Sequence, residues 1–113
     1  MYTEITNNKY LGNYDNQSLV TEIHGNTLHL TGDIDLYVAT VFREVGESHV
    51  RDHAEPVIDL TGVPFLDSAG LASLLSIARV ARTHNRLLHI VATGNPRRVL
   101  RITGVDQMIS MQD

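Results

Sequence analysis

Short strand patterns alternate with amphipathic helix patterns along most of the chain, and this alternation constrains the fold more than any other feature. The segments SLVTEIH and TLHLT flank Gly25-Asn26, a two-residue turn that predicts a β-hairpin. With the hairpin included, the predicted order of elements is β-β-α-β-α-β-α-β, so that helices and strands alternate after the hairpin. We therefore predict an α/β fold with a mixed, largely parallel sheet and helices packed on it.

The three later strands are short and are bounded by turn residues. VIDL at 57–60 lies between a Pro and a Gly, and its β-branched start is typical of a buried strand. LLHIVA at 87–92 and QMIS at 107–110 are predicted to be the next two strands. Within the hairpin, Leu28 and Leu30 should share one face of the sheet, because successive side chains of a strand alternate.

Apolar residues at helical spacing predict a first helix over 38–45. Asp33 or Asp35 is placed to cap its N-terminus, and Gly46 weakens its C-terminal end. The clearest helix of the chain follows Asp67-Ser68. One face of it is apolar and consists of Leu71, Leu74, Leu75, Ala78 and Ala81. Four other residues are free to face elsewhere, namely Ser73, Ser76, Arg79 and Arg82.

Turn residues mark the ends of the last two helices. Asn85 is able to adopt a left-handed conformation and so to stop the clearest helix. In ATGNPRRVLRITG, Asn95 is the predicted N-cap and Pro96 takes the first helical position. Gly104 lies just past the last helical turn, where the chain can reverse.

The length of 113 residues fits one domain, which we place at 17–113 after a polar N-terminal arm at 1–16. There is no cysteine, so disulfides, thiolate metal sites and cysteine nucleophiles are excluded. No apolar run approaches the roughly 20 residues that a membrane helix needs, and the N-terminus lacks a signal-peptide pattern. We expect a cytoplasmic protein that does not contact a membrane.

Charge is distributed unevenly along the chain. The formal net charge of −4 argues against a general nucleic-acid-binding protein. Residues 1–67 contain eleven Asp or Glu and three Lys or Arg, whereas residues 68–113 contain six Arg and two Asp. Two interpretations remain open. The arginine-rich helix surfaces are simply solvated, or the molecule has one acidic and one basic face that docks a charged protein partner.

Asp67-Ser68 stands between the 57–60 strand and the clearest helix. In open α/β folds functional residues gather at the carboxyl ends of strands, and a helix N-terminus favours an anion. Ser68 therefore has three candidate roles: a helix cap together with Asp67, a nucleophile, or an acceptor of a phosphoryl group. The nucleophile is disfavoured, because Leu66 occupies the position of the first Gly in the G-x-S-x-G elbow of serine hydrolases.

Six histidines make a metal site worth considering. His49 and His53 are four residues apart and would share a helix face, while His24 and His29 lie on the hairpin strands. No third ligand and no metal-binding motif accompanies either pair. We therefore expect solvated or hydrogen-bonded histidines, and neither a metal nor a cofactor.

Three segments together resemble the STAS domain, and most closely the bacterial anti-sigma factor antagonists. They are GDID at 32–35, VIDLTGVPFLDSAGLASLL at 57–75 and NPRRVLRITGVDQMI at 95–109. In order and spacing the resemblance covers about residues 18–111, and its most specific element is the Asp-Ser-x-Gly sequence at 67–70. It implies a single-domain STAS-like fold.

The resemblance also implies a regulatory function without catalysis by this chain. In such family members an anti-sigma factor, which is a serine kinase, phosphorylates the Ser after the Asp, here Ser68. The unphosphorylated protein binds the anti-sigma factor and thereby releases the sigma factor. Phosphorylation ends binding, and a phosphatase resets the cycle. The residues implied at the partner surface are Asp35, Asp59, Asp67, Ser68, Ala69, Gly70 and Leu71.

Two other functions remain open. A STAS module that senses a ligand or scaffolds an assembly without phosphorylation would have the same fold. A small serine hydrolase would use Ser68 as its nucleophile. Two of the implied partner residues also have structural alternatives, because Asp35 could be a helix cap and Asp59 a hydrogen-bonded acid near a strand end.

Overall fold

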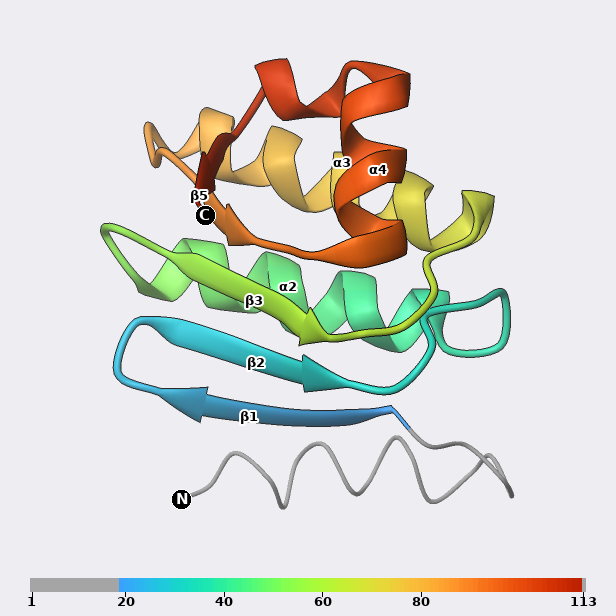
Figure 1. Cartoon of the computed structure of the whole chain (residues 1–113). Helices are drawn as coiled ribbons and strands as arrows, with labels where there is room; N and C mark the ends of the chain where they lie inside the picture. The colour runs from blue at the N-terminus through green and yellow to red at the C-terminus, as the bar shows by residue number, and fades with distance from the viewer. Residues whose placement is uncertain (1–18, 113) are drawn as a thin grey trace.

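Five strands form one sheet in the order β1-β2-β3-β4-β5, and the computed structural model describes residues 19–112 (Figure 1). The strands are β1 (Val20–His24), β2 (Thr27–Thr31), β3 (Val57–Gly62), β4 (His89–Val91) and β5 (Ser110–Gln112). β1 and β2 are antiparallel, whereas all later neighbours are parallel. The predicted mixed, largely parallel sheet is confirmed. The arm proposed at 1–16 lies outside the described residues.

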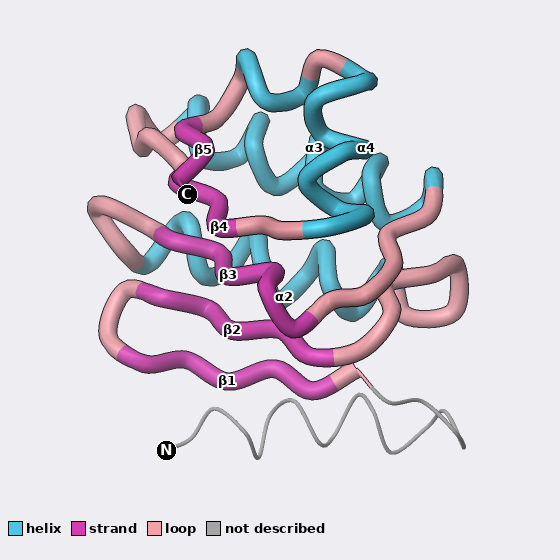
Figure 2. The backbone as a smooth tube through the Cα atoms, viewed as in Figure 1, coloured by secondary structure: helices cyan, strands magenta, loops and turns pink. Residues whose placement is uncertain are grey.

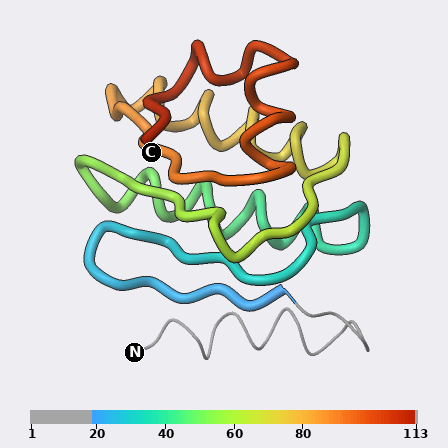
Figure 3. Tube along the Cα trace, in the orientation of Figure 1, coloured from blue at the N-terminus to red at the C-terminus, as the bar shows by residue number. Residues whose placement is uncertain are grey.

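The sheet is built in chain order, as the run of colour across Figure 3 shows. Gly25 has a φ of 63°, which permits the tight reversal between β1 and β2. The Asn26 amide donates to the carbonyl of Glu55 at 2.7 Å, and the Asn26 carbonyl accepts from the N–H of Val57 at 2.9 Å. The hairpin turn is therefore fastened to the start of β3.

Three helices connect the strands: α2 (Ala39–Asp52), α3 (Ser68–Thr83) and α4 (Gly94–Thr103). α2 and α3 pack along each other on one face of the sheet. α4 follows β4 and lies apart from α2, at the end of the sheet that β4 and β5 form (Figure 2). A short 3₁₀ turn, Val105–Gln107, precedes β5.

The core lies between the sheet and the helices. Leu28 and Leu30 are buried on one face of β2, as predicted from the alternation of strand residues. Phe42 is fully buried and comes first by volume among the fully buried side chains of residues 19–112. Further fully buried residues from other elements are Ile58, Leu60, Leu74, Ile77 and Ile90. This packing holds the start of α3 at a defined place beside the sheet.

The predicted ends of the first helix are wrong. α2 begins at Ala39 without a side-chain cap, and the Asp35 carboxylate instead accepts the N–H of Tyr37 at 3.0 Å in the preceding loop. α2 also continues through Gly46 to Asp52. Gly46 is buried where α2 crosses α3, and a Cβ at this position would collide with the side chain of Ile77. The glycine therefore permits close helix packing and does not end the helix.

The predicted start of the last helix is also wrong. α4 begins at Gly94, so Asn95 is its second residue and Pro96 its third. Asn95 is not a cap, because its side chain bonds to a distant segment described below. The two left-handed ends are confirmed, since Asn85 has a φ of 57° and Gly104 a φ of 80°.

Three smaller differences come from packing between elements. Ser73 does not face solvent but is buried, and its hydroxyl donates to the carbonyl of Ala39 on α2 at 2.8 Å. β4 is shorter than the predicted 87–92. β5 begins at Ser110 and not at 107, because the 3₁₀ turn occupies the intervening segment.

Candidate functional site

The junction of β3 and α3, formed by residues 65–71, is the leading candidate site, and we call it the Ser68 corner. Asp67 is the N-cap of α3, and its Oδ1 accepts the N–H of Gly70 at 2.9 Å. Ser68 is the first helical residue and is exposed. None of the described residues hydrogen-bonds to its hydroxyl. The cap role thus belongs to Asp67, and the Ser68 hydroxyl is available to a partner molecule.

The GDID segment at 32–35, which we call the GDID turn, lies directly beside the Ser68 corner. The N–H of Ile34 donates to the carbonyl of Phe65 at 2.9 Å, and the N–H of Asp67 donates to the carbonyl of Ile34 at 3.2 Å. Ile34 and Leu66 consequently form a parallel bridge between the two segments. Asp35, which follows Ile34, is brought close to the corner by this bridge. Backbone bonds of this kind hold the corner in one conformation.

Gly70 is buried against both segments. A Cβ at Gly70 would lie 2.6 Å from Leu66 Cδ1 and 2.8 Å from the carbonyl oxygen of Ile34. The second of these atoms belongs to the backbone and has little freedom to move. The Asp-Ser-x-Gly sequence therefore needs its Gly for the close approach of α3 to the GDID turn.

α4 also supports the corner. The Asn95 Oδ1 accepts the N–H of Leu66 at 3.0 Å, across 29 residues of sequence. This bond satisfies a backbone donor in the loop just before the N-cap of α3. Asn95 therefore helps to position the loop that carries Leu66. The sequence pattern predicted a helix cap at this residue, because nothing nearby in the sequence indicates its distant partner.

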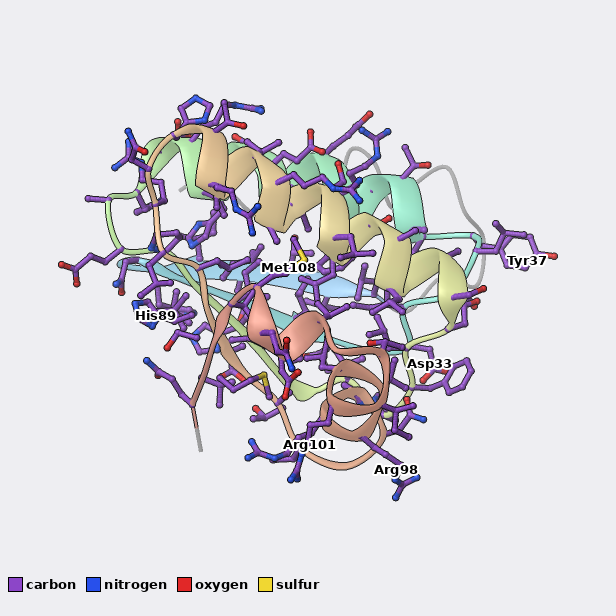
Figure 4. The ribbon with its side chains drawn as sticks, turned by 90° about the horizontal axis from the view of Figure 1, so that it is seen from above. Asp33, Tyr37, His89, Arg98, Arg101 and Met108 are labelled. Carbon is purple, nitrogen blue, oxygen red and sulfur yellow. The ribbon has the colours of Figure 1, made fainter. Side chains whose placement is uncertain are left out.

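Large apolar side chains are exposed on the two loops that meet at the corner. Leu36 and Tyr37 are 70% and 67% exposed, and Phe65 is 45% exposed. Figure 4 shows the Tyr37 side chain directed away from the body of the molecule. Sequence reasoning assigned no role to these residues. They could have been found in the sequence as large apolar residues that lie in loops and do not fit the apolar spacing of a helix or a strand.

Asp59 lies on β3, and its contacts are with a different cluster. Ile58 and Leu60 are buried in the core, so the Asp59 side chain between them points to the opposite face of the sheet. Its carboxylate accepts from the Thr61 N–H at 2.9 Å and the Thr61 hydroxyl at 2.7 Å, and Oδ2 lies 3.1 Å from His29 Nδ1. A role of Asp59 at the Ser68 corner stays a prediction.

The environment of Asp59 favours its charged form. Partial burial alone would raise the pKa of the Asp59 carboxyl. The hydrogen bonds from Thr61 and the neighbouring His29 outweigh this effect and leave the pKa below its ordinary value. Asp59 is therefore an ionised carboxylate at neutral pH, as a structural strand acid would be.

The histidines make hydrogen bonds with the backbone and with acids. His49 is buried, its Nε2–H donates to the carbonyl of Asn26 at 2.8 Å, and His53 Nδ1 lies 2.9 Å from the carbonyl of His49. Within residues 19–112, no group of three or more His, Asp or Glu side chains is arranged to hold a metal ion. The same part of the chain contains no helix long and apolar enough to cross a bilayer.

Burial lowers the pKa of His49 below its ordinary value of 6.5, and the nearby His53 lowers it further. The bond to Asn26 and the charge of Asp52 act in the opposite direction but do not cancel the shift. Protonation would add a hydrogen to Nδ1, which is buried without a hydrogen-bond partner among the described residues. The folded protein therefore resists protonation at His49.

We expect the stability of the domain to fall as the pH drops below 6.5. In this range the unfolded chain binds a proton at His49 that the folded protein does not, so the free energy of unfolding decreases. His49→Gln keeps an amide donor for Asn26 but cannot titrate, and its stability should depend less on pH. Urea denaturation between pH 7 and pH 5 measures this difference. Ser48→Ala, at an exposed neighbouring position, should behave as wild type; equal pH dependence in all three proteins would contradict the assignment.

Comparison with known proteins places this architecture in a family. The family model described as "Mlab, STAS domain" matches residues 19–111, which is nearly the whole described chain. The chain belongs to the STAS domain family. The resemblance predicted from GDID, the Asp-Ser-x-Gly sequence and the late helix is thereby confirmed. No curated protein matches this STAS domain in sequence.

Solved structures of anti-sigma factor antagonists are similar to this STAS domain. One from Mycobacterium paratuberculosis is 28% identical, with a TM-score of 0.70 over 83% of each chain. SpoIIAA in its unphosphorylated form is 15% identical, with a TM-score of 0.62 over 85% of this chain and 88% of that chain. The Bacillus cell fate determinant SpoIIAA in its phosphorylated form is 14% identical, with a TM-score of 0.62 over 85% of this chain and 92% of that chain. The two SpoIIAA structures support the fold.

The STAS fold brings most of the predicted partner residues to one place. Ser68 is exposed, Ala69 and Leu71 are half-buried, and Gly70 is buried within the same helical turn. Asp67 caps that turn, and Asp35 lies on the bridged loop beside it. Of the residues predicted for the partner surface, Asp59 is the one whose hydrogen bonds and ion pair lie elsewhere.

Proposed function

We propose that this STAS domain is an anti-sigma factor antagonist of the bacterial cytoplasm, controlled by phosphorylation at Ser68. In its unphosphorylated form it binds an anti-sigma factor kinase through the Ser68 corner, and the sigma factor is released. Phosphorylation of Ser68 ends this binding, and a phosphatase restores it. The observation that carries the proposal is the exposed Ser68 hydroxyl, unbonded within the described chain, at the N-terminus of α3.

The position of Ser68 suits a reversible charge switch. A phosphoryl group would add about −1.5 to −2 charges at a helix N-terminus, where the partial positive charge of the helix tolerates an anion. The fold would therefore survive the modification. The corner already carries Asp67 on its cap and Asp35 on the adjacent loop. A further dianion would make the surface strongly negative and costly to desolvate in an interface.

The apolar residues around the corner provide the contact area that a protein partner needs. Exposed Leu36, Tyr37 and Phe65 lie on the two loops that the bridge between Ile34 and Leu66 holds together. Binding energy in protein interfaces is concentrated in a few large, well-packed side chains, with Tyr among the favoured types. We infer that these three residues surround the phosphorylated position and make contact with the anti-sigma factor.

The comparisons support this function in two ways. The similar structure from Mycobacterium paratuberculosis is that of an anti-sigma factor antagonist. SpoIIAA, which has the same fold, is known in both an unphosphorylated and a phosphorylated form. A phosphorylated state is thus compatible with this fold.

The test compares Ser68→Ala with Ser68→Asp in binding to the purified cognate anti-sigma factor. Ser68→Ala should bind like wild type, whereas Ser68→Asp should bind at least about tenfold more weakly, a loss of roughly 1.4 kcal/mol. Calorimetry measures both affinities, and mass spectrometry after incubation with ATP identifies the modified residue. Ser48→Asp makes the same chemical change at an exposed site on α2 and should bind normally.

Two outcomes would contradict the proposal. If Ser68→Asp binds as tightly as wild type, the domain is better described as a phosphorylation-independent STAS sensor or scaffold. If the kinase and ATP leave Ser68 unmodified, the switch does not exist. A serine hydrolase would instead be labelled at Ser68 by a fluorophosphonate probe. We expect no labelling, because none of the described histidines bonds to the Ser68 hydroxyl as an activating base would.

A further inference from the structure

A basic groove lies on α4. It has a volume of about 340 Å³ and is lined by Gly94, Arg97, Arg98, Arg101 and Ile102. We call it the α4 groove. Figure 4 shows the side chains of Arg98 and Arg101 projecting from α4 away from the rest of the molecule. The opposite side of α4 is anchored in the protein by buried Pro96 and Leu100.

The two projecting arginines have no acid to balance them. Neither Arg98 nor Arg101 forms a hydrogen bond or ion pair with another described residue. The sequence contains no Asp or Glu between Ser68 and Val105, so α4 itself cannot supply one, and Asp106 in the following 3₁₀ turn forms no ion pair with either arginine. A concave surface with uncompensated positive charge attracts anionic groups and raises their local concentration.

The groove also has an apolar side. Ile102 is 75% exposed, more than any other large apolar residue of the described chain. It lies four residues after Arg98 and therefore on the same face of the helix. Gly94 lies four residues before Arg98, and a Cβ there would meet no atom within 4 Å, so the N-terminal end of this stripe is open. Charge and apolar surface consequently alternate along one helix face.

We propose that the α4 groove binds an acidic segment of a protein partner, with carboxylates on Arg98 and Arg101 and an apolar side chain on Ile102. Such a surface fits an acidic peptide better than a nucleic acid for two reasons. The chain is acidic overall, with a net charge of −4, and the exposed apolar side chain of Ile102 cannot bind a phosphate backbone. The proposal does not depend on phosphorylation of Ser68.

The groove and the Ser68 corner are physically connected. Asn95, in the first turn of α4, accepts the N–H of Leu66 in the loop before Ser68. A partner seated at the corner therefore has the start of α4 beside it. An acidic segment of that partner would reach the groove without crossing the sheet. Its contact with the groove would not depend on whether Ser68 is phosphorylated.

NMR titration of the full chain tests the groove with a defined probe. The ¹⁵N-labelled protein is titrated with the synthetic peptide EELEELEELEEL and, separately, with its lysine counterpart KKLKKLKKLKKL. We expect the acidic peptide to cause saturable chemical-shift changes in the amides of residues 94–102. The affinity should fall as salt is added, because salt screens the interaction between the charges. The double substitution Arg98→Gln and Arg101→Gln should weaken binding about tenfold, and Ile102→Ser should weaken it severalfold.

Two controls separate the groove from general charge attraction and from the switch. Arg79→Gln with Arg82→Gln removes two arginines from α3 and should leave the peptide affinity unchanged. Ser68→Asp should also leave it unchanged, which distinguishes failure of this inference from failure of the proposed function. The inference is overturned if the α3 pair weakens binding as much as the α4 pair, if the shifted amides lie outside the groove, or if single-stranded RNA or anionic vesicles occupy it more tightly than the acidic peptide.

Discussion

Phe42→Ala should lower the free energy of unfolding by about 3–5 kcal/mol. Phe42 is fully buried between α2 and the sheet, and its removal leaves a cavity that the surrounding side chains fill only in part. A domain of this size has a total stability of roughly 5–15 kcal/mol, so a large share of it would be lost. Urea denaturation followed by circular dichroism measures the change.

Tyr37→Ala is the matched control for this truncation. It also removes an aromatic ring, but Tyr37 is 67% exposed and its ring contributes little to the core. The free energy of unfolding should change by no more than about 0.5 kcal/mol, as is usual for surface positions. A similar loss of stability in both variants would show that Phe42 does not occupy the core as described. With the cognate anti-sigma factor, Tyr37→Ala should instead weaken binding.

Gly70→Ala should destabilise the protein by about 1–3 kcal/mol, although Ala normally favours a helix over Gly by roughly 1 kcal/mol. The added methyl group would lie 2.8 Å from the carbonyl oxygen of Ile34 and 2.6 Å from Leu66 Cδ1. The backbone of the GDID turn would have to move away from α3 to make room. This displacement would stretch the bond from the Asp67 N–H to Ile34, which shapes the Ser68 corner.

Gly46→Ala gives the control, because Gly46 is also a buried helical glycine. Its Cβ would collide with the side chain of Ile77, which is fully buried and β-branched, and would meet no atom of the Ser68 corner. Because the packed core leaves Ile77 little room to move, Gly46→Ala should also destabilise the protein, but without displacing the Ser68 corner. Thermal unfolding compares the two variants, and binding of the anti-sigma factor should be reduced in Gly70→Ala alone. Reduced binding in both variants would mean that the effect of Gly70→Ala comes from general destabilisation and not from a change at the corner.

Local features of the chain were predicted correctly wherever the cause lay within a few residues. The turn at Gly25-Asn26 and the left-handed positions Asn85 and Gly104 depend on backbone preferences of those residues themselves. The capping of α3 by Asp67 depends on an N–H three residues away. The Asp-Ser-x-Gly sequence therefore identified the candidate site before any tertiary contact was known.

Errors arose where the partner of a residue lies far along the chain. Asn is a residue type that is favoured at helix N-caps, but the side chain of Asn95 accepts the N–H of Leu66, 29 residues earlier in the chain. Gly46 has the low helix propensity of any glycine, but close packing against α3 extends the helix through it. Ser73 has a polar side chain, but a carbonyl on α2 satisfies its hydroxyl within the interior.

Periodicity, turn preference and capping act between near neighbours, so the order of strands and helices, the hairpin and the position of Ser68 at the start of a helix could be read from the amino-acid sequence. Which residues lie beside Ser68 depends on contacts between segments that are far apart in the chain. The bridge between Ile34 and Leu66 holds the loop that carries Asp35 beside the corner, whereas the pairing of β2 with β3 places Asp59 beside His29. These contacts depend on how distant elements pack, and burial and hydrogen bonding between elements override local propensity.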